Sequence, residues 1–265
     1  MEYSRLLILG LVQGLTEFLP VSSSAHLILM PRLAGWEDQG LVLDIFAHLG
    51  SLIAVLLYFR KDLARIVPAW ANSLHRPASA GDGRICWYLL IATFPSAVAG
   101  LLLYETVATT FRNPLLIAYT SIFFALVLLL ADYTGKRVRK EHHLSLKDAV
   151  WIGLAQVLSL MPGTSRSGIT MTAGLFLGLD RHTAARFSFL LALPTIMLAG
   201  GYDIYKYLQG GTGAEPGALA VILLASAISS WCAIRFFLAL IERTGMLPYV
   251  IYRLLLGMVL LYLYL

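Results

Sequence analysis

The chain has 265 residues, of which 58% are hydrophobic and only 13% are charged. Soluble domains carry about 25% charged residues, so this composition argues against a water-soluble globule. The formal net charge of +5 does not indicate a nucleic-acid-binding protein, because the basic residues gather in short loops between apolar segments.

Residues 1–40 are apolar but carry more polar groups than a secretory signal would tolerate, so we expect no cleavable signal peptide. Gln13 and Glu17 lie four residues apart and share a helix face, and Ser22 and His26 share a face in the same way. Pro20 stands between the two pairs. We expect two short helices joined at this Pro/Ser-rich turn.

Three apolar segments follow, at 41–59, 85–104 and 114–131, and each is close to the ~20 residues that cross a bilayer as a helix. The loop after the first segment is basic, the loop at 105–113 has only Arg112, and the linker at 132–147 is basic again. The basic residues are Arg60, Lys61, Arg65, Arg76 and Arg84 in the first loop, and Lys136, Arg137, Arg139, Lys140 and Lys147 in the linker. The positive-inside rule places both basic segments in the cytoplasm.

A second polar segment covers residues 148–182 and contains Pro162-Gly163-Thr164-Ser165-Arg166-Ser167. Three more apolar segments follow it, at 183–207, 218–241 and 247–265, and the loop at 208–217 has no Lys or Arg. The chain is therefore expected to be an all-α integral membrane protein with six transmembrane helices. A soluble protein with buried helices is the alternative, and the shortage of charge disfavours it.

The order of features in the first half recurs in the second. Gly10-Leu11-Val12-Gln13 returns as Gly153-Leu154-Ala155-Gln156, and a Pro/Ser-rich turn and three apolar segments follow each copy. Repeat one covers about 1–131 and repeat two about 148–265, within a single membrane domain. Three crossings are an odd number, so the second repeat must enter the membrane in the opposite sense, which gives inverted-topology repeats.

Both polar segments are too polar and too interrupted by proline to span the membrane. With the basic segments inside, residues 1–40 must enter and return on the outer side, and 148–182 on the cytoplasmic side. Irregular backbone at membrane depth is tolerated only where protein or a wet cavity surrounds it, so the tips of two re-entrant helical hairpins should meet inside the bundle. Helix N-termini that point into such a cavity favour phosphate.

The ionisable residues at the two tips are functional candidates because charge at this depth is costly. Glu17 suits a divalent cation or a base, and His26 suits an acid, a base or a nucleophile. The planar fork of Arg166 binds phosphate oxygens well. We expect hydroxyl and backbone N–H groups to hold the other oxygens, at Ser22, Ser24, Gly163, Ser165, Ser167 and Thr170. A purely structural Glu17–Arg166 ion pair is the alternative.

Gln13-Gly14-Leu15-Thr16-Glu17, with Pro20-Val21-Ser22-Ser23 and His26 after it, and Pro162-Gly163-Thr164-Ser165-Arg166-Ser167-Gly168 with Thr170, form two separate motifs. They resemble the (E/Q)xxxE and PGxSRSxxT segments of undecaprenyl-diphosphate phosphatases of the BacA/UppP type. Residues 187–192 and 251–253 also look like family positions, so the resemblance covers essentially the whole chain.

The resemblance implies hydrolysis of undecaprenyl pyrophosphate to undecaprenyl phosphate and inorganic phosphate. It also implies recycling of the cell-wall carrier lipid, bacitracin resistance and a divalent cation, Mg²⁺ or Ca²⁺. Glu17, His26 and Arg166 fall on the family's essential residues, and Ser23 falls on a proposed nucleophile. Glu17 is the expected metal ligand, with Gln13 as a weaker one because it lacks the carboxylate that many members carry there.

The expected location is the bacterial plasma (inner) membrane, with the site open to the periplasmic side. The expected partners are a polyprenyl diphosphate lipid, the bilayer and a second copy in a homodimer, but no nucleic acid. A polyprenyl-phosphate flippase, alone or with hydrolysis, is the second functional reading, and a channel-like or structural protein is a weaker third. The Ser/His segment superficially resembles one motif of PAP2-type phosphatases, whose partner motifs we do not find.

Three further residues carry open or weaker expectations. Asp44 and His48 lie four residues apart, and they either extend the site or form hydrogen bonds across helices. Arg253, inside the last apolar segment, is a candidate for a second phosphate, but we expect its side chain to extend to the cytoplasmic surface.

Overall fold

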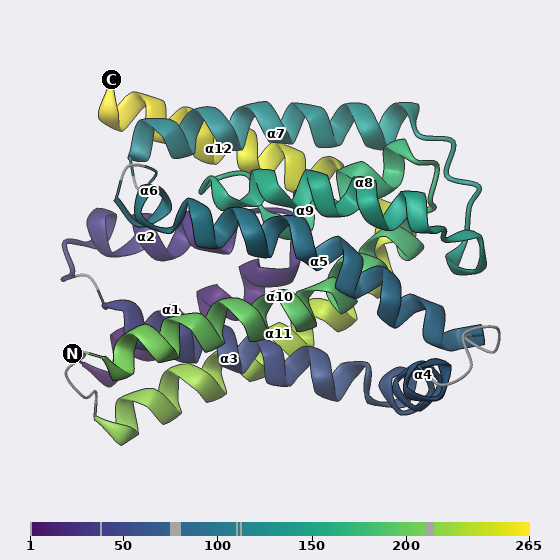
Figure 1. The fold of residues 1–265 in the computed structure, drawn as a ribbon. Helices are drawn as coiled ribbons and strands as arrows, with labels where there is room; N and C mark the ends of the chain where they lie inside the picture. Colours follow the sequence, from purple (N-terminus) through teal and green to yellow (C-terminus); the bar gives the residue numbers. More distant parts are fainter. Residues whose placement is uncertain (1, 38, 75–80, 110, 112, 210–214) are drawn as a thin grey trace.

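The structure is a computed structural model, and it describes residues 2–37, 39–74, 81–109, 111, 113–209 and 215–265. Arg76, Arg112 and residues 210–214, which entered the loop-charge argument, lie outside the described residues. Within them every element is a helix (Figure 1). In chain order the helices are α1 (Tyr3–Phe18), α2 (Ser23–Ala34), α3 (Leu41–Tyr58), α4 (Arg60–Ser73), η2 (Gly81–Gly83), α5 (Arg84–Leu102), α6 (Tyr104–Thr109), α7 (Pro114–Thr134), η4 (Glu141–His143), α8 (Leu146–Val157), η5 (Leu158–Leu160), α9 (Arg166–Phe176), α10 (Arg181–Leu208), α11 (Pro216–Thr244) and α12 (Leu247–Tyr264).

Six of the described helical segments are long and apolar enough to cross a membrane. They are Leu41–Tyr58, Gly81–Leu102, Pro114–Thr134, Arg181–Tyr205, Pro216–Thr244 and Leu247–Tyr264. Each coincides with one of the six predicted segments, with ends that differ by a few residues. The chain is therefore a multi-pass, all-helical membrane protein, as the composition predicts.

Helix α4 occupies the stretch that the sequence indicated only as a basic loop. Within α4, Ile66 is buried, whereas Arg60 and Lys61 are exposed. Phe59, the residue before the helix begins, is also buried. A short helix with one apolar face and several charges lies at a surface rather than across a membrane. A search for long apolar segments could not find it.

The two predicted helix pairs are present as α1 with α2 and α8 with α9, and each pair returns to where it began. The Arg5 guanidinium at the start of α1 lies 5.6 Å from the ring of Trp36, just beyond α2. Arg139 donates hydrogen bonds to Asp148 at the start of α8 and to the Leu177 carbonyl beyond α9, both at 2.8 Å. The two pairs occupy opposite ends of the molecule (Figure 1).

Each pair packs on a long helix from the other half of the chain. Helix α1 lies along α11, and α8 lies along α5. Helices α3 and α10 pack on each other, and they also pack on α11 and α5, respectively. Glycines permit close approach of α1 to α11 and of α8 to α5. A Cβ atom at Gly10 would lie 2.7 Å from the Ile222 carbonyl oxygen, and one at Gly153 would lie 2.6 Å from that of Ala92. The repeated Gly-Leu-x-Gln sequence thus serves the same packing in both halves.

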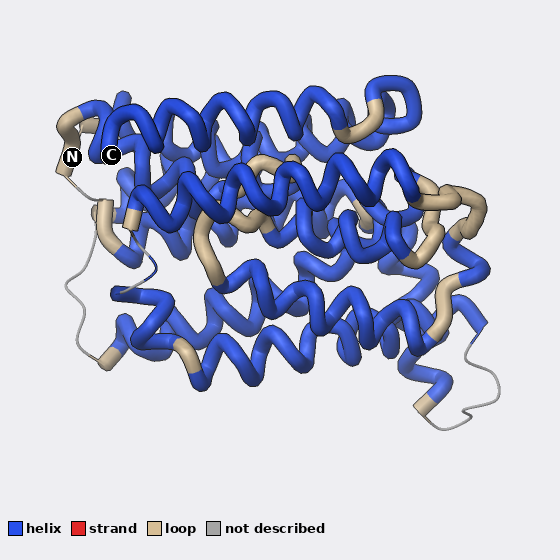
Figure 2. The backbone as a smooth tube through the Cα atoms, turned by 90° about the horizontal axis from the view of Figure 1, so that it is seen from above, coloured by secondary structure: helices blue, strands red, loops and turns tan. Residues whose placement is uncertain are grey.

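Aromatic packing supports the inner end of α1. The rings of Phe18 and Phe189 meet edge to face with centroids 5.2 Å apart, and the Phe237 ring lies 5.5 Å from that of Phe189. All three side chains are buried. The tube view shows short loop segments interrupting the helices in the middle of the molecule as well as at its ends (Figure 2). The packing of Phe18 therefore holds the last residue of α1 at one of these breaks.

Candidate active site at the two helix breaks

The breaks after α1 and before α9 are joined by direct hydrogen bonds. The Gly163 N–H donates to Ser22 Oγ at 3.1 Å, and Ser167 Oγ donates to the Leu19 carbonyl at 2.8 Å. Residues about 140 positions apart in the chain therefore form one compact unit. The prediction that the two tips meet is confirmed by these contacts.

Glu17 and Arg166 form an ion pair at this junction. Arg166 Nη2 lies 2.9 Å from Glu17 Oε1, and both side chains are largely buried. The other carboxylate oxygen, Oε2, accepts hydrogen bonds from Ser23 Oγ at 2.6 Å and from Gln13 Nε2 at 2.9 Å. Three residues that the sequence singled out, Arg166, Ser23 and Gln13, thus bond the carboxylate of a fourth, Glu17.

Gly163 occupies a position that no other residue fits. Its φ is +92°, in the left-handed region, and a Cβ atom there would lie 2.2 Å from Thr120 Oγ1. The Thr120 hydroxyl also donates to the Pro162 carbonyl at 2.7 Å. The Pro-Gly pair of the second motif therefore sets the path of the backbone against α7.

Arg253 corrects one expectation. Its side chain does not extend to the surface: only 1% of it is exposed, and Nη2 donates to the carbonyls of Gly163 and Thr164 at 2.8 and 3.0 Å. Its Nε and Nη1 groups have no hydrogen-bond partner among the residues that the structure describes. The two carbonyls of the turn hold the guanidinium inside the bundle. Arg253 therefore positions the second tip.

His26 is held away from the ion pair by contacts of its own. Its Nδ1 lies 2.7 Å from the Ser22 carbonyl, and its Nε2 forms a short hydrogen bond with the Tyr252 hydroxyl. The two rings are stacked with centroids 5.6 Å apart. Because a carbonyl only accepts, Nδ1 carries the hydrogen, so in neutral His26 the Nε2 atom accepts from Tyr252.

The predicted phosphate-binding hydroxyls already form a network within the protein. Ser165 Oγ accepts from the Gly168 N–H and lies 3.1 Å from Ser167 Oγ. Thr170 Oγ1 lies 2.7 Å from Ser188 Oγ, and Arg166 Nη1 donates to the Ser188 carbonyl at 3.2 Å. Ser24 Oγ lies 3.3 Å from Ser22 Oγ. Ser188 is an addition that the motif spacing did not indicate, because it lies on a separate helix, α10.

Asp44 and His48 differ in their placement. His48 Nε2 lies 3.7 Å from Glu17 Oε2, so His48 extends the site. The Asp44 carboxylate instead accepts from Gln39 Nε2 at 2.6 Å, and its carbonyl lies 2.8 Å from His48 Nδ1. Of the two residues, His48 lies beside Glu17, and Asp44 bonds Gln39 and the His48 ring.

The side-chain oxygens of Glu17 and Gln13 are of the type that binds a hard cation such as Mg²⁺. Among the described residues no group of three or more His, Cys, Asp or Glu side chains is gathered closely enough to hold a metal ion by itself. Gln13 Oε1, however, is buried and has no hydrogen-bond partner in the described part of the chain, and the Gln13 side chain bonds Glu17 through Nε2. Mg²⁺ is commonly bound by one or two protein oxygens together with substrate phosphates and water.

These features define a multi-pass membrane protein with a buried, charged site of the kind that binds a lipid-borne phosphate. The family model described as "Bacitracin resistance protein BacA" matches residues 6–259, and the chain belongs to this family. An undecaprenyl-diphosphatase of Nitrosococcus oceani is 50% identical over 264 residues, which cover 100% of both chains. Undecaprenyl-diphosphatase 2 of Stutzerimonas stutzeri is 50% identical over 267 residues, covering 100% of this chain and 99% of that protein. A third relative, from Thioalkalivibrio sulfidiphilus, is 47% identical over 265 residues and 100% of both chains.

Proposed function

We propose that this chain hydrolyses undecaprenyl diphosphate to undecaprenyl phosphate and inorganic phosphate. The activity would recycle the carrier lipid of cell-wall synthesis and confer resistance to bacitracin. Membership of the family and the names of full-length relatives at 47–50% identity support the reaction. The observation that supports the site is that Ser23 and Arg166 both bond the carboxylate of Glu17.

The membrane topology that we propose has two re-entrant hairpins, α1–α2 and α8–α9, that enter from opposite sides. Repeat one would cover about residues 1–131, and repeat two about residues 148–265. The exchange of packing partners between the halves supports inverted repeats. The linker at 132–147 carries the basic residues and would be cytoplasmic. The active site would then open to the periplasmic side of the inner membrane.

The diphosphate would bind between the N-termini of α2 and α9. Helix N-termini present free N–H groups and partial positive charge, which suit phosphate oxygens. Arg166 at the first position of α9 adds a full charge and a planar fork. The hydroxyls of Ser22, Ser24, Ser165, Ser167 and Thr170 line the same junction. Binding would require some of their present hydrogen bonds to be exchanged for bonds to phosphate.

In the chemical step Ser23 Oγ attacks the terminal phosphorus, and Glu17 takes the hydroxyl proton. The 2.6 Å hydrogen bond from Ser23 to Glu17 Oε2 provides the path for that proton. The bond from the terminal phosphorus to the bridging oxygen breaks, and undecaprenyl phosphate leaves with the electron pair. Glu17 passes its proton to the departing undecaprenyl phosphate and is again a carboxylate. It then takes a proton from the water that attacks the phosphoserine, the P–Oγ bond breaks, and the proton returns from Glu17 to Ser23 Oγ as phosphate leaves. His26, one turn further along α2, would exchange protons with the leaving group.

A divalent cation, Mg²⁺ or Ca²⁺, would be held by Glu17 and by the unpartnered carbonyl oxygen of Gln13. When bound it would neutralise charge on the phosphate oxygens. Because position 13 offers an amide rather than a carboxylate, this chain would hold the cation with one negative charge from the protein. We therefore expect Gln13→Glu to lower the cation concentration needed for half-maximal activity.

Phosphate release from a prenyl diphosphate by the purified protein in detergent tests the proposal. Glu17→Gln, Ser23→Ala and Arg166→Ala should each lose activity, and Arg235→Ala, at an exposed arginine of α11, should not. Arg166→Ala removes a transition-state charge that is worth about 10³-fold or more in phosphoryl transfer. A phosphoserine at position 23, trapped by rapid acid quench and detected by mass spectrometry, would identify the nucleophile. Full activity of Arg166→Ala would refute the site.

A flippase for polyprenyl phosphate remains the second candidate, because exchanged packing between two halves is a feature of transporters. An inward-open state would have to break the ion pairs Arg181–Asp132 at 2.6 Å and Arg186–Asp62 at 2.7 Å. Transfer of labelled lipid phosphate across vesicles, measured with the Ser23→Ala variant, separates flipping from hydrolysis. No transfer above protein-free vesicles would reject this second function.

A further inference from the structure

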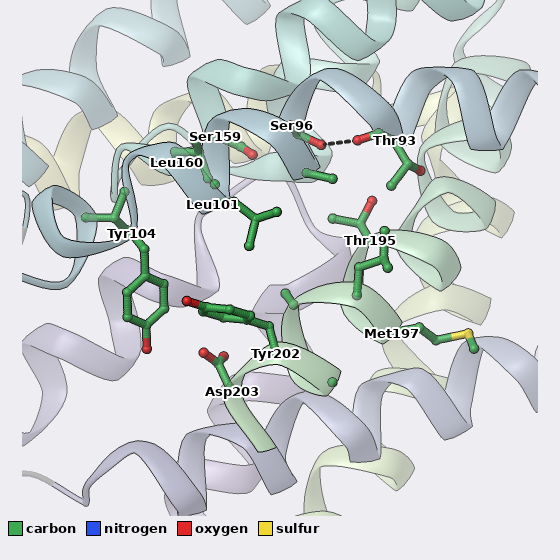
Figure 3. Close-up of a pocket in the computed structure, with 16 residues that line it drawn as sticks. Thr93, Ser96, Leu101, Tyr104, Ser159, Leu160, Thr195, Met197, Tyr202 and Asp203 are labelled. Carbon is green, nitrogen blue, oxygen red and sulfur yellow. Dashed lines mark hydrogen bonds between the residues drawn. The ribbon is translucent and has the colours of Figure 1, made fainter. Parts of the chain in front are cut away.

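A cavity of about 610 Å³ lies between α5, α6, η5 and α10 (Figure 3). Its walls are mostly apolar, with Leu101 and Leu160 on one side and Met197 and Leu198 on the other. The volume falls within the ~300–1,000 Å³ of small-molecule sites. A hollow of this kind inside a membrane bundle suits an apolar chain rather than a polar solute.

Small residues create the space. Gly100 and Ala97 of α5 and Ala199 and Gly201 of α10 line the cavity. A Cβ atom built at Gly201 would have no heavy atom within 4 Å, in contrast to the crowded Gly10. Gly201 therefore does not serve close helix packing. Its lack of a side chain instead keeps the cavity open.

Two chains of neighbouring residues link the cavity to the catalytic junction. Gln156 Nε2 donates to Ser96 Oγ at 2.6 Å in the cavity wall, and η5 leads directly into the Pro162–Gly163 turn. At the other end, Asp203 of α10 lines the cavity, and α10 packs on α3, which carries His48; His48 Nε2 lies 3.7 Å from Glu17. Figure 3 shows the Asp203 carboxylate directed toward the cavity.

We propose that this cavity binds the prenyl units of the substrate that lie next to the diphosphate. The inference rests on the proposed function, because it takes a prenyl diphosphate as the substrate. An undecaprenyl chain is far longer than the cavity, so its remaining units extend into the bilayer. Binding of the first units in the cavity would hold the diphosphate against Glu17 and Arg166. Affinity for the substrate would then depend on the first prenyl units and not on the length of the whole tail.

A cavity-filling substitution tests this assignment. Gly201→Leu places a branched apolar group in the space of about one isoprene unit, and we expect the KM for farnesyl diphosphate to rise at least tenfold, with kcat changed by less than threefold. A tenfold rise corresponds to ~1.4 kcal/mol of lost binding. The control is Ala220→Leu, which adds the same group on an exposed face of α11 and should leave KM unchanged.

Photocrosslinking gives a readout that is independent of kinetics. A prenyl diphosphate analogue with a photoreactive group in its first isoprene unit should label peptides that contain Met197, Leu198 or Leu101. Excess farnesyl diphosphate should suppress this labelling, and Gly201→Leu should reduce it. If the protein hydrolyses the analogue but is labelled at other residues, the cavity assignment is wrong and the proposed function stands. The same conclusion follows if ordinary phospholipid suppresses the labelling. A failure to hydrolyse any prenyl diphosphate would overturn the proposed function as well.

Discussion

Ser22 and Ser165 adopt the same rare backbone conformation at corresponding places in the two halves of the chain. Their φ angles are 73° and 69°, and each is the residue before the second helix of its pair. A non-glycine residue with positive φ costs energy, about 1–2 kcal/mol, and persists where surrounding structure holds it. Here the hydroxyls hold it: Ser22 Oγ accepts from Gly163, and Ser165 Oγ accepts from Gly168.

Substitutions at Ser22 should separate the cost of its backbone conformation from the value of its hydroxyl. Ser22→Ala leaves the buried Gly163 N–H unpaired and keeps the strained φ, so we expect a loss of ~1–3 kcal/mol in stability. Ser22→Gly loses the same hydrogen bond but relieves the strain, and it should be the less destabilised of the two. Thermal unfolding in detergent measures both. Equal melting temperatures for the two variants would show that the positive φ of Ser22 carries no energetic cost.

Removal of the buried Arg253 charge should reduce activity more than stability. Arg253→Met keeps the side-chain length and deletes a buried cation whose Nε and Nη1 groups have no hydrogen-bond partner among the described residues, so the relief of that uncompensated burial offsets the lost hydrogen bonds. The Gly163 and Thr164 carbonyls lose their donor, however, and the second tip shifts. A misplacement of ~1 Å at a reacting centre can cost about 100-fold. The expected result is a fall in kcat of that order with a melting temperature close to that of the wild type.

Tyr252→Phe tests the positioning of His26. The variant keeps the stacked ring but removes the hydroxyl that bonds Nε2, so the imidazole loses its orientation. General acid–base catalysis contributes about 10²–10⁴-fold, so His26→Ala should lose that much and Tyr252→Phe only part of it. The pH–rate profile should also change in Tyr252→Phe. A purely structural tyrosine would leave the profile unaltered.

The contribution of Asp148 to stability should vanish in acid. Burial alone would raise the pKa of Asp148, but hydrogen bonds from Arg139 and Ser145 and the charge of Arg139 lower it overall. A lowered pKa in the folded state means that the stabilisation is complete above the unfolded value of ~3.9 and is lost as the pH falls through the folded value. Asp148→Asn should therefore melt lower than the wild type at pH 7, and the gap should narrow below pH ~4. A gap that stays constant would refute the coupling.

The sequence predicted the spans, the two helix pairs and the residues at their tips, since these follow from apolar length, proline placement and local spacing. It could not predict which groups pair across the junction. Ser188 and Tyr252 lie in the segments 187–192 and 251–253 that resemble the family, but nothing in the sequence shows that they bond Thr170 and His26. Arg253 was wrongly expected at the surface because length alone suggests that an arginine near a helix end reaches water. Two backbone carbonyls bind it instead.

The exchanged packing of the two helix pairs has a consequence for the assembly of the protein. Helix α1 packs most extensively on α11 and helix α8 on α5, so each half lacks the main packing partner of its own pair, although α3 also contacts α1 and α10 also contacts α9. A chain cut between Arg137 and Lys147 would give two fragments that each expose a polar pair to lipid, and they should be stable only when they are made together.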